Sequence, residues 1–406
     1  MSSAHLTSLE LSAPPVVKVI GRRSLLIGVV ASVIAVGLAY SNLAVFFQGY
    51  LLSFMDWLGI CLGSMVILMI RHLTGGGWGM VIRRVLGAAM RTLPLMALFF
   101  VPIAWLAVPR LYPWAMAPEA IEDPKIREHL VHNQFVTSDY LNWKGFIVRA
   151  VIYFAIWGVL VFLLSIWSRQ QNKPPVRDNS ARFKAVSGPG LILFALTVSF
   201  AAIDWVMSLD PSWMSTIYGL LFVAGELLAG LCFAVVIERI LFRYKPMSVL
   251  LRPDFVHDHG KFMLTFIMVW AYFSFSQWLI IWAGNLPEEI TWYMRRLHGG
   301  WGYVGVFLVL FHFAVPFVLL LSRPFKRDIT KLVWLAAWML FMRYVDLFWI
   351  IEPNFSATFR VTLAEILIPF AMGGLWIAYF CWNLNSMPLL PAYDVYAKQV
   401  LEPEHE

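Results

Sequence analysis

The sequence predicts an all-α integral membrane protein with about ten transmembrane helices. Of the 406 residues 60% are hydrophobic and only 14% are charged, and the mean hydropathy is +0.72. This composition is too apolar for a soluble domain. Apolar runs long enough to cross a bilayer recur along the whole chain, and basic residues gather in alternate connecting segments. The same observations define one membrane domain, residues 24–384, between two polar tails, 1–23 and 385–406.

The expected spans follow the apolar runs. In chain order they cover approximately residues 24–47, 50–70, 93–108, 143–167, 188–207, 213–241, 262–283, 301–321, 332–351 and 361–382. The first run is too long for the core of a signal peptide, so we expect an uncleaved membrane anchor. The longest loop, 109–142, has mixed charge and several prolines, which is typical of an ordered cap on the outer face.

Two details of these spans lead to expectations about single residues. Between the fifth and sixth spans Pro211 cannot continue the preceding helix, and Ser212 is expected to cap the following one. In the third helix Arg83, Arg84 and Arg91 precede the apolar part, so we expect them to snorkel to the cytoplasmic surface.

The distribution of basic residues predicts the orientation. Of the 31 Lys and Arg residues, 22 fall on the side that ten spans assign to both chain ends, eight fall on the other side, and Arg343 lies within a span. By the positive-inside rule both termini are expected in the cytoplasm. The net charge of +7 therefore fits an inner membrane leaflet better than nucleic acid.

Several kinds of cofactor site are not expected on this chain. Cys61, Cys232 and Cys381 all lie inside apolar runs, and the sequence has no CxxC or CxxCH motif. A c-type haem, an iron–sulfur cluster or a zinc site built by this chain is therefore not predicted. A b-type haem needs two facing histidines within the bilayer, and only His312 is deep in a span.

Ionisable residues inside the spans are costly and are the main functional signal. Because a helix rises about 1.5 Å per residue, position along a span gives depth. Toward the outside we expect Asp204, Arg343, Asp346 and Glu365 in the outer third of the membrane, with Asp210, Arg295, Arg296, His298 and Glu352 in the loops just above them. Near the midplane we expect Glu226, Gln277 and His312. At the inner surface we expect Glu238, His257, His259 and Lys261. Together they predict a polar column across the membrane that is denser on the outside.

Structural explanations compete with function for many of these groups. Arg343 and Asp346 are one helical turn apart, and a simple ion pair and a site component are equally open. His312 can relay protons or only bind a neighbouring helix. Asp56, near the outer end of the second span, is expected only to form a local hydrogen bond, and His257 and His259 are expected to be solvated.

The residues alone leave three interpretations open. The chain can be a proton-coupled transporter, the quinone- and proton-handling subunit of a redox complex, or a structural anchor. In each of them the buried carboxylates require a proton, a partner or water.

Four segments of the sequence resemble one family. They are DWVMSLDPSWMSTIYG (204–219), HGKFMLTFIMVWAYFSFSQWLIIWAGNLPEEITWYMRR (259–296), HGGW (298–301) and MRYVDLFWIIEP (342–353). This pattern, which extends over residues 25–382, resembles quinone-binding subunit 2 of alternative complex III, a quinol:cytochrome c oxidoreductase unrelated to the cytochrome bc complex. That subunit belongs to the NrfD-like, polysulfide-reductase-type membrane family.

The resemblance implies a fold and a set of partners. The fold would be two four-helix bundles related by internal repetition, plus two flanking helices, in a bacterial inner membrane. The partners would be a paralogous NrfD-like quinol-binding subunit, a periplasmic iron–sulfur subunit, c-type haem subunits and, as electron acceptor, a cytochrome c or a terminal oxidase. Electrons would leave a quinol such as menaquinol for these partners, so this chain would have no catalytic residue or redox centre of its own.

Two hypotheses for the site follow from the resemblance. In the first, a quinol pocket at the outer face is framed by Asp204, Arg296, His298, Arg343 and Asp346. In the second, which we favour, no quinol binds here and a proton path is formed by Asp204, Glu226, His312, Asp346 and Glu365, with His259 and Lys261 at its inner end. A stand-alone proton-coupled transporter and a purely structural anchor remain the alternatives.

Overall fold

The computed structural model describes residues 12–121, 123–132, 139–171 and 178–390. Over these residues the chain forms helices and connecting loops, and ten of the helices are long and apolar enough to cross a membrane. They are Pro15–Ser41 (α1), Leu43–Thr74 (α2), Trp78–Leu111 (α3, α4, η2 and α5), Trp143–Gln170 (α7), Ser180–Leu209 (α8 and η6), Tyr218–Leu241 (α9), Pro253–Gly284 (α11), Trp301–Leu321 (α13, η7 and α14), Ile329–Asn354 (α16 and η8) and Leu363–Asn385 (α17). The prediction of an all-helical chain with ten membrane-spanning helices is confirmed.

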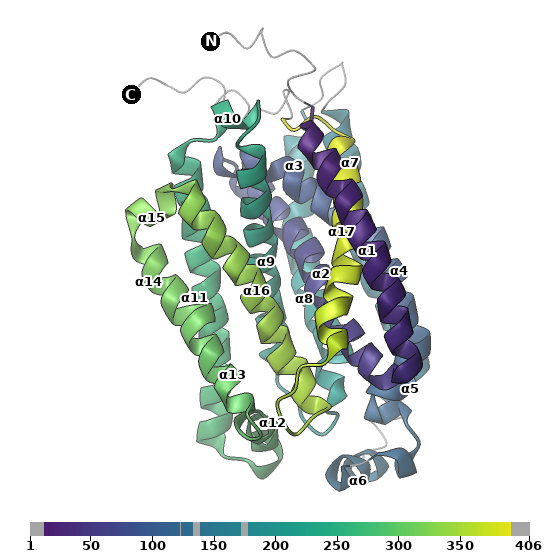
Figure 1. The fold of residues 1–406 in the computed structure, drawn as a ribbon. Coiled ribbons are helices and arrows are strands. Elements are labelled where there is room, and N and C mark those ends of the chain that lie inside the picture. Colours follow the sequence, from purple (N-terminus) through teal and green to yellow (C-terminus); the bar gives the residue numbers. More distant parts are fainter. Residues whose placement is uncertain (1–11, 122, 133–138, 172–177, 391–406) are drawn as a thin grey trace.

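Short helices cover the two ends of the bundle. Pro124–His132 (α6) and Pro287–Leu297 (α12) lie at one end, and Met247–Leu250 (α10) and Arg323–Arg327 (α15) lie at the other (Figure 1). The start of α1 and the end of α17 are both at the α10 end, as an even number of spans requires (Figure 1). We refer below to the α12 end and the α10 end.

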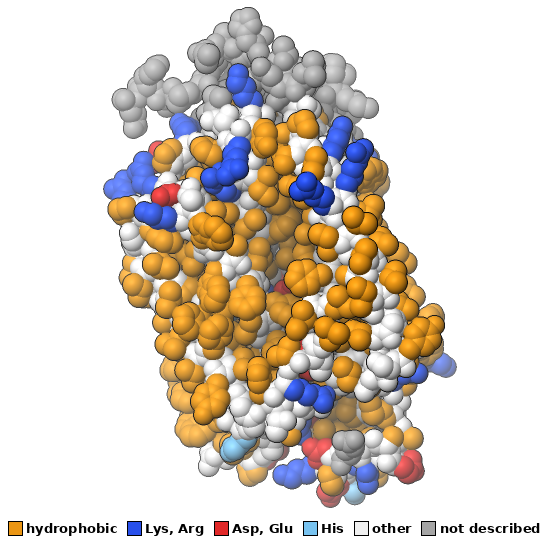
Figure 2. Space-filling model, in the orientation of Figure 1, with side chains coloured by type: hydrophobic (Ala, Val, Ile, Leu, Met, Phe, Trp, Pro, Cys, Tyr) orange, Lys and Arg blue, Asp and Glu red, His pale blue; other side chains and the backbone are white. Residues whose placement is uncertain are grey.

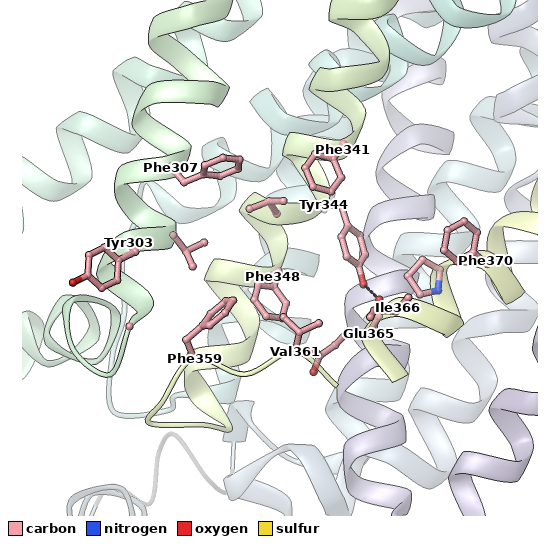
Figure 3. A pocket seen from close by; sticks show the side chains of 14 residues that line it. Tyr303, Phe307, Phe341, Tyr344, Phe348, Phe359, Val361, Glu365, Ile366 and Phe370 are labelled. Atoms are coloured by element: carbon pink, nitrogen blue, oxygen red, sulfur yellow. Dashed lines mark hydrogen bonds between the residues drawn. The ribbon is translucent and has the colours of Figure 1, made fainter. Parts of the chain in front are cut away.

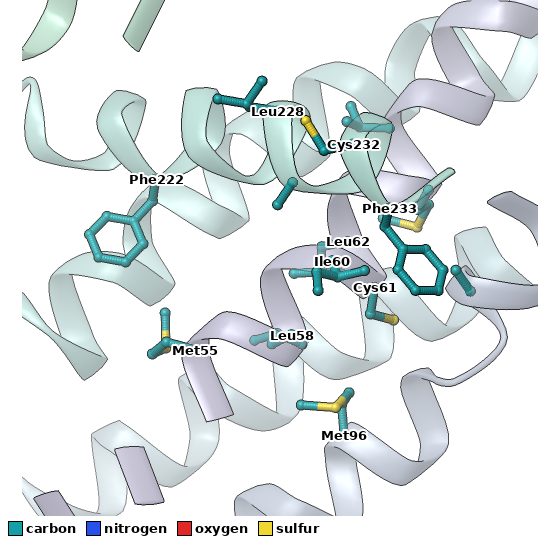
Figure 4. Packing of buried hydrophobic residues seen from close by; sticks show 14 of the residues in the cluster. Met55, Leu58, Ile60, Cys61, Leu62, Met96, Phe222, Leu228, Cys232 and Phe233 are labelled. Carbon is teal, nitrogen blue, oxygen red and sulfur yellow. The ribbon is translucent and has the colours of Figure 1, made fainter. Parts of the chain in front are cut away.

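The core lies around α2 and α9. In the most apolar stretch of α2 89% of the residues are buried and in that of α9 72%, whereas the corresponding figure for α1 is 17%. Leu58, Leu62 and Leu228 are among the side chains packed between these two helices (Figure 4). Lipid-facing helices such as α1 instead direct their apolar side chains outward, which gives the broad apolar band in Figure 2.

Glycines allow α2 and α9 to approach closely. A Cβ atom on Gly63 would lie 1.8 Å from the backbone oxygen of Glu226, and one on Gly230 would lie 2.3 Å from the carbonyl carbon of Gly63. Contacts between small residues of this kind bring helix backbones together in membranes, where lipid removes the hydrophobic driving force. The approach matters for function because Glu226 is carried on α9 at this crossing.

Two local expectations are wrong, one about Ser212 and one about the arginines of the third helix. Ser212 does not cap the sixth span, because α9 begins only at Tyr218, and the Ser212 hydroxyl donates to Asp210 instead (2.6 Å). The segment between η6 and α9 is therefore longer than the short turn expected from Pro211 and a helix cap at Ser212.

Arg83 and Arg84 of α3, and Arg91 just after it, are buried in protein and do not snorkel to the membrane surface. Arg83 donates to Gln171 (2.6 Å), Arg84 to Ser168 (2.8 Å) and Arg91 to the backbone oxygen of Asn383 (2.8 Å). Each is at most 7% exposed. The basic residues therefore join α3 to neighbouring segments at the α10 end.

Candidate functional site: carboxylates around Arg343

The candidate site is centred on an ion pair within α16. Arg343 Nη1 donates to Asp346 Oδ2 at 2.6 Å, and the two residues are 2% and 3% exposed, respectively. They are three positions apart, so one helical turn brings them together. The ion pair, which the sequence left as one of two open possibilities, is therefore present.

Two further carboxylates come to the same guanidinium from other helices. Asp56 of α2 and Glu226 of α9 both lie close enough to Arg343 to interact with it electrostatically. Gly225 provides the space for Arg343, because a Cβ there would lie 2.2 Å from the guanidinium carbon. The cluster thus assembles at the crossing of α2, α9 and α16.

The charges of this cluster do not balance. One guanidinium faces three carboxylates, so full ionisation would leave two negative charges in excess. Neither Asp56 nor Glu226 makes a side-chain hydrogen bond or ion pair with any other described residue, and Glu226 is 2% exposed. Uncompensated charge is costly in a membrane interior, and the cluster becomes neutral when two protons are bound. We call Asp56, Glu226, Arg343 and Asp346 the Arg343 cluster.

A tryptophan connects the cluster to the buried histidine. Trp270 of α11 donates to Asp346 Oδ2 (3.2 Å), and its ring stacks on His312 with centroids 4.0 Å apart and an interplanar angle of 3°. His312 lies in the π-helix η7 (Val309–Ala314), a backbone form that is frequent at functional sites. Neither ring nitrogen makes a hydrogen bond of normal geometry with the described residues, although the backbone of Met342 is near.

Tyr218, at the start of α9, connects the Arg343 cluster with ionisable groups nearer the α12 end. It is 1% exposed and interacts electrostatically with Arg296, Arg343, Asp346 and Asp210. Asp210 in turn accepts from Arg295 (2.9 Å), which also pairs with Asp123, just before α6 (2.8 Å). Ionisable groups therefore extend from this end of the molecule to the Arg343 cluster.

The hydrogen bonds of Arg296 have a structural role. It donates to the backbone oxygens of Trp292 (2.9 Å), Trp349 (3.2 Å) and Ile350, and its guanidinium lies 3.5 Å from the centroid of the Trp292 ring. These contacts fasten α12 to the end of α16. His298 is exposed and contacts the backbone oxygen of Met294 (2.8 Å).

Asp204 lies in a separate site. Its Oδ2 accepts from Arg149 Nε (2.8 Å) and from the Tyr153 hydroxyl (2.7 Å), both on α7. Arg149 also donates to the backbone oxygen of Tyr140 (2.9 Å) and lies over its ring, 4.0 Å from the centroid. Burial and the nearby Asp204 carboxylate raise the pKa of the Tyr140 hydroxyl. Of the five residues predicted to frame a quinol pocket, Arg296, Arg343 and Asp346 all interact electrostatically with Tyr218, whereas Asp204 pairs with Arg149 and His298 is exposed.

Glu365 acts first as a helix cap. Its Oε2 accepts from the backbone N–H of Thr362 (2.7 Å) in a capping box at the start of α17. The Tyr344 hydroxyl donates to its backbone oxygen, and Glu352 lies near enough to interact electrostatically with its carboxylate. Its Oε1 is buried and has no hydrogen-bond partner in the described part of the chain.

At the α10 end His259 is fully buried, which corrects the expectation that it is solvated. Its Nδ1 lies 3.0 Å from Glu238 Oε2, and its Nε2 lies 2.9 Å from the backbone oxygen of Trp78. Lys261 is exposed and pairs with Asp258 (3.0 Å). Glu238 follows Glu226 by twelve residues, or about 18 Å along α9. The polar column is therefore divided into the Arg343 cluster and, at the α10 end, the pair of Glu238 and His259.

The sequence interpretation missed three partners in this arrangement: Asp56, Trp270 and Tyr218. A lone carboxylate inside a span was the available signal for Asp56. No such signal exists for Trp270 and Tyr218, because aromatic residues are abundant along the whole chain.

Comparison with known proteins adds no family assignment, since no family model matches the sequence and no curated protein is similar to it. Within the described ranges, His, Cys, Asp and Glu side chains form no group of three that could hold a metal ion.

Proposed function

We propose that this chain is a proton-transferring membrane subunit of a quinol:cytochrome c oxidoreductase of the alternative complex III type. The observation that carries the proposal is the Arg343 cluster, in which three carboxylates from three helices share one guanidinium. Such a cluster takes up or releases protons when the charge near it changes. The four sequence segments that resemble quinone-binding subunit 2 supply the link to quinol oxidation.

In this proposal the chemistry of electron transfer takes place on partner subunits. The paralogous subunit would bind menaquinol or another quinol, and the periplasmic iron–sulfur subunit and the c-type haem subunits would carry electrons to a cytochrome c or a terminal oxidase. The two four-helix bundles, the cytoplasmic termini and the bacterial inner membrane belong to the same proposal. The role of this chain is then to move protons as those electrons leave the quinol.

The groups divide this work by position. Asp210 and Tyr218 connect the α12 end to the Arg343 cluster, and the Trp270–His312 stack extends it sideways to η7. The pair of Glu238 and His259 lies about 18 Å from Glu226 along α9, so water must bridge the interval for protons to reach the α10 end. A carboxylate and an imidazole are suitable carriers because each binds and releases one proton.

The first experiment is purification of this chain from its native membrane in mild detergent. The proposal predicts that c-type haem, an iron–sulfur protein and a second ten-helix subunit co-purify, seen by visible spectroscopy and subunit mass. A chain that is stable, colourless and alone would contradict the redox assignment. The Arg343 cluster would then favour a stand-alone proton-coupled transporter, to be tested by uptake in liposomes.

The second experiment tests the proton path in the assembled complex. Glu226→Gln and Asp56→Asn should lower the number of protons moved per electron while quinol oxidation continues. Asp254→Asn is the matched control, because that carboxylate is exposed and pairs with Arg327 at the surface. A normal ratio in both cluster variants would leave the chain with a structural role only.

A further inference from the structure

A groove runs along the lipid-facing side of the α12 half of the molecule. It has a volume of about 750 Å³ and is formed by α13, α16, the start of α17 and the loop before it (Figure 3). Its walls are mostly aromatic and include Phe307, Phe341, Tyr344, Phe348, Phe359 and Phe370. No group of the Arg343 cluster lines it.

The groove opens sideways to the membrane. Phe341 and Phe370 at its rim are 51% and 61% exposed, whereas Phe348 in its wall is 7% exposed. In Figure 2 the face between α16 and α17 is hollowed, with apolar side chains on both sides of the hollow. An occupant can therefore enter from the bilayer without crossing water.

The size of the groove favours a slender occupant over a transmembrane helix, which could enter it only with part of its surface. A helix with side chains is about 10–12 Å wide and about 30 Å long for 20 residues, which corresponds to a volume of about 2,400–3,400 Å³. The groove is several times smaller. It is suited to a slender hydrocarbon chain, which packs against the rings by van der Waals contact.

A cation stands beside the groove at the α12 end. Arg360 is exposed and lies between two groove-lining residues, Phe359 and Val361. Glu352 and Glu365 interact with it electrostatically, but its side chain makes no hydrogen bond or ion pair with another described residue. Arginine is particularly suited to phosphate, because its planar fork donates two parallel hydrogen bonds.

We propose that the groove holds one acyl chain of a phospholipid whose phosphate binds Arg360. The lipid fills the space between α13 and α17 and ties the loop before α17 to the membrane surface. The inference is independent of the proposed proton transfer, because it uses none of the four residues of the Arg343 cluster.

A different amphiphile is the main competitor. Glu365 lines the groove, and its unpartnered Oε1 could accept a hydrogen bond from the hydroxyl of a quinol. A phosphate has no such donor and would instead depend on Arg360. The two occupants also differ in mass, so one measurement distinguishes them.

The test is native mass spectrometry of the full chain during stepwise removal of lipid by detergent. We expect one adduct of phospholipid mass to remain after the other lipids are lost. Arg360→Gln should lower its retention about fivefold, the effect of losing one basic residue at an anionic lipid surface. Arg110→Gln, a change to an exposed arginine at the same end, should leave retention unchanged.

Two further comparisons make the proposal easy to overturn. Ile366→Trp narrows the groove and should reduce retention, whereas Ile192→Trp, at an exposed position on α8 outside the groove, should not. Delipidated chain should rebind dioleoyl phosphatidylglycerol about fivefold better than dioleoylglycerol, which lacks the phosphate. A retained quinone, detergent alone, or equal behaviour of Arg360→Gln and Arg110→Gln would each overturn the phospholipid assignment.

Discussion

The molecule contains two buried acid–arginine sites whose chemistry is the same and whose stoichiometry differs. In the first, Asp204 faces Arg149, and its bonded oxygen also accepts from Tyr153. In the second, Arg343 faces Asp346, Asp56 and Glu226, and only Asp346 is bonded to it. The first site is electrically balanced as an ion pair, whereas the second is balanced only when protons are added.

This difference separates structural from functional carboxylates more clearly than depth in the membrane does. A buried ion pair with matched charges joins two helices, here α7 and α8, and loses stability when either partner is removed. A site with surplus carboxylates can lose one of them without leaving an unpaired cation. The two sites should therefore respond in opposite ways to the same kind of substitution.

The largest effect on stability is expected from a substitution that disrupts the crossing of α2 and α9, which brings surplus carboxylates to Arg343. Gly63→Ala would place a Cβ 1.8 Å from the backbone oxygen of Glu226, and a backbone atom cannot turn aside as a side chain can. We expect a loss of more than about 3 kcal/mol of stability through overpacking. Thermal unfolding in detergent can be followed with a thiol-reactive dye, since all three cysteines are free and buried.

Gly87→Ala is the control for that substitution. Gly87 is also a buried helical glycine, but a Cβ there would meet nothing within 4 Å. Its replacement should leave unfolding unchanged or raise stability by up to about 1 kcal/mol. Equal melting of the Gly63 variant and the wild type would show that α2 and α9 are not held at this distance.

The second effect contrasts the two sites directly. Asp204→Asn leaves Arg149 without its counter-ion and should cost about 3 kcal/mol. Glu226→Gln removes one surplus acid of the Arg343 cluster and should leave stability unchanged, or increase it, in the same unfolding measurement. Destabilisation by Glu226→Gln as large as that by Asp204→Asn would contradict the distinction between a balanced and an unbalanced site.

The sequence predicted the ten helices because each span needs a long apolar run, and such runs are visible without a structure. It predicted the surroundings of the basic residues less well. The third helix includes Arg83 and Arg84 before its apolar part, as expected, but Arg83, Arg84 and Arg91 bind other segments of the protein and do not reach the membrane surface. An apolar scan treats those arginines as exposed to solvent.

The site was predicted only in part, for a related reason. Arg343 and Asp346 share a helix, so their spacing alone brings them together. Asp56 and Glu226 are on two other helices, and helices that are apolar on all sides give no indication of which face turns inward. Glu238 and His259 were likewise expected at a similar depth, but their pairing depends on how α9 and α11 are rotated.

The third effect concerns His312, which extends the Arg343 cluster through its stack on Trp270. His312→Phe keeps a ring to stack on Trp270 and should change stability by no more than about 1 kcal/mol. It should nevertheless lower the number of protons moved per electron, because the phenyl ring cannot carry a proton. His298→Phe, at an exposed position, is the control and should change neither quantity. An unchanged ratio in His312→Phe would confine proton transfer to the carboxylates.

The smallest effect is expected at the α10 end, where a buried and an exposed ion pair lie only two residues apart along α11. Lys261→Gln breaks the exposed pair with Asp258 and should change stability by less than about 0.5 kcal/mol. His259→Gln, by contrast, removes the partner of buried Glu238 and should cost more in the same unfolding measurement. If Lys261→Gln lowered the proton-to-electron ratio while stability stayed constant, the exposed lysine would be the terminus of the path at the α10 end. With no such change, Lys261 lies off the path, and the buried pair of His259 and Glu238 is the remaining candidate at this end, because Glu238 shares α9 with Glu226.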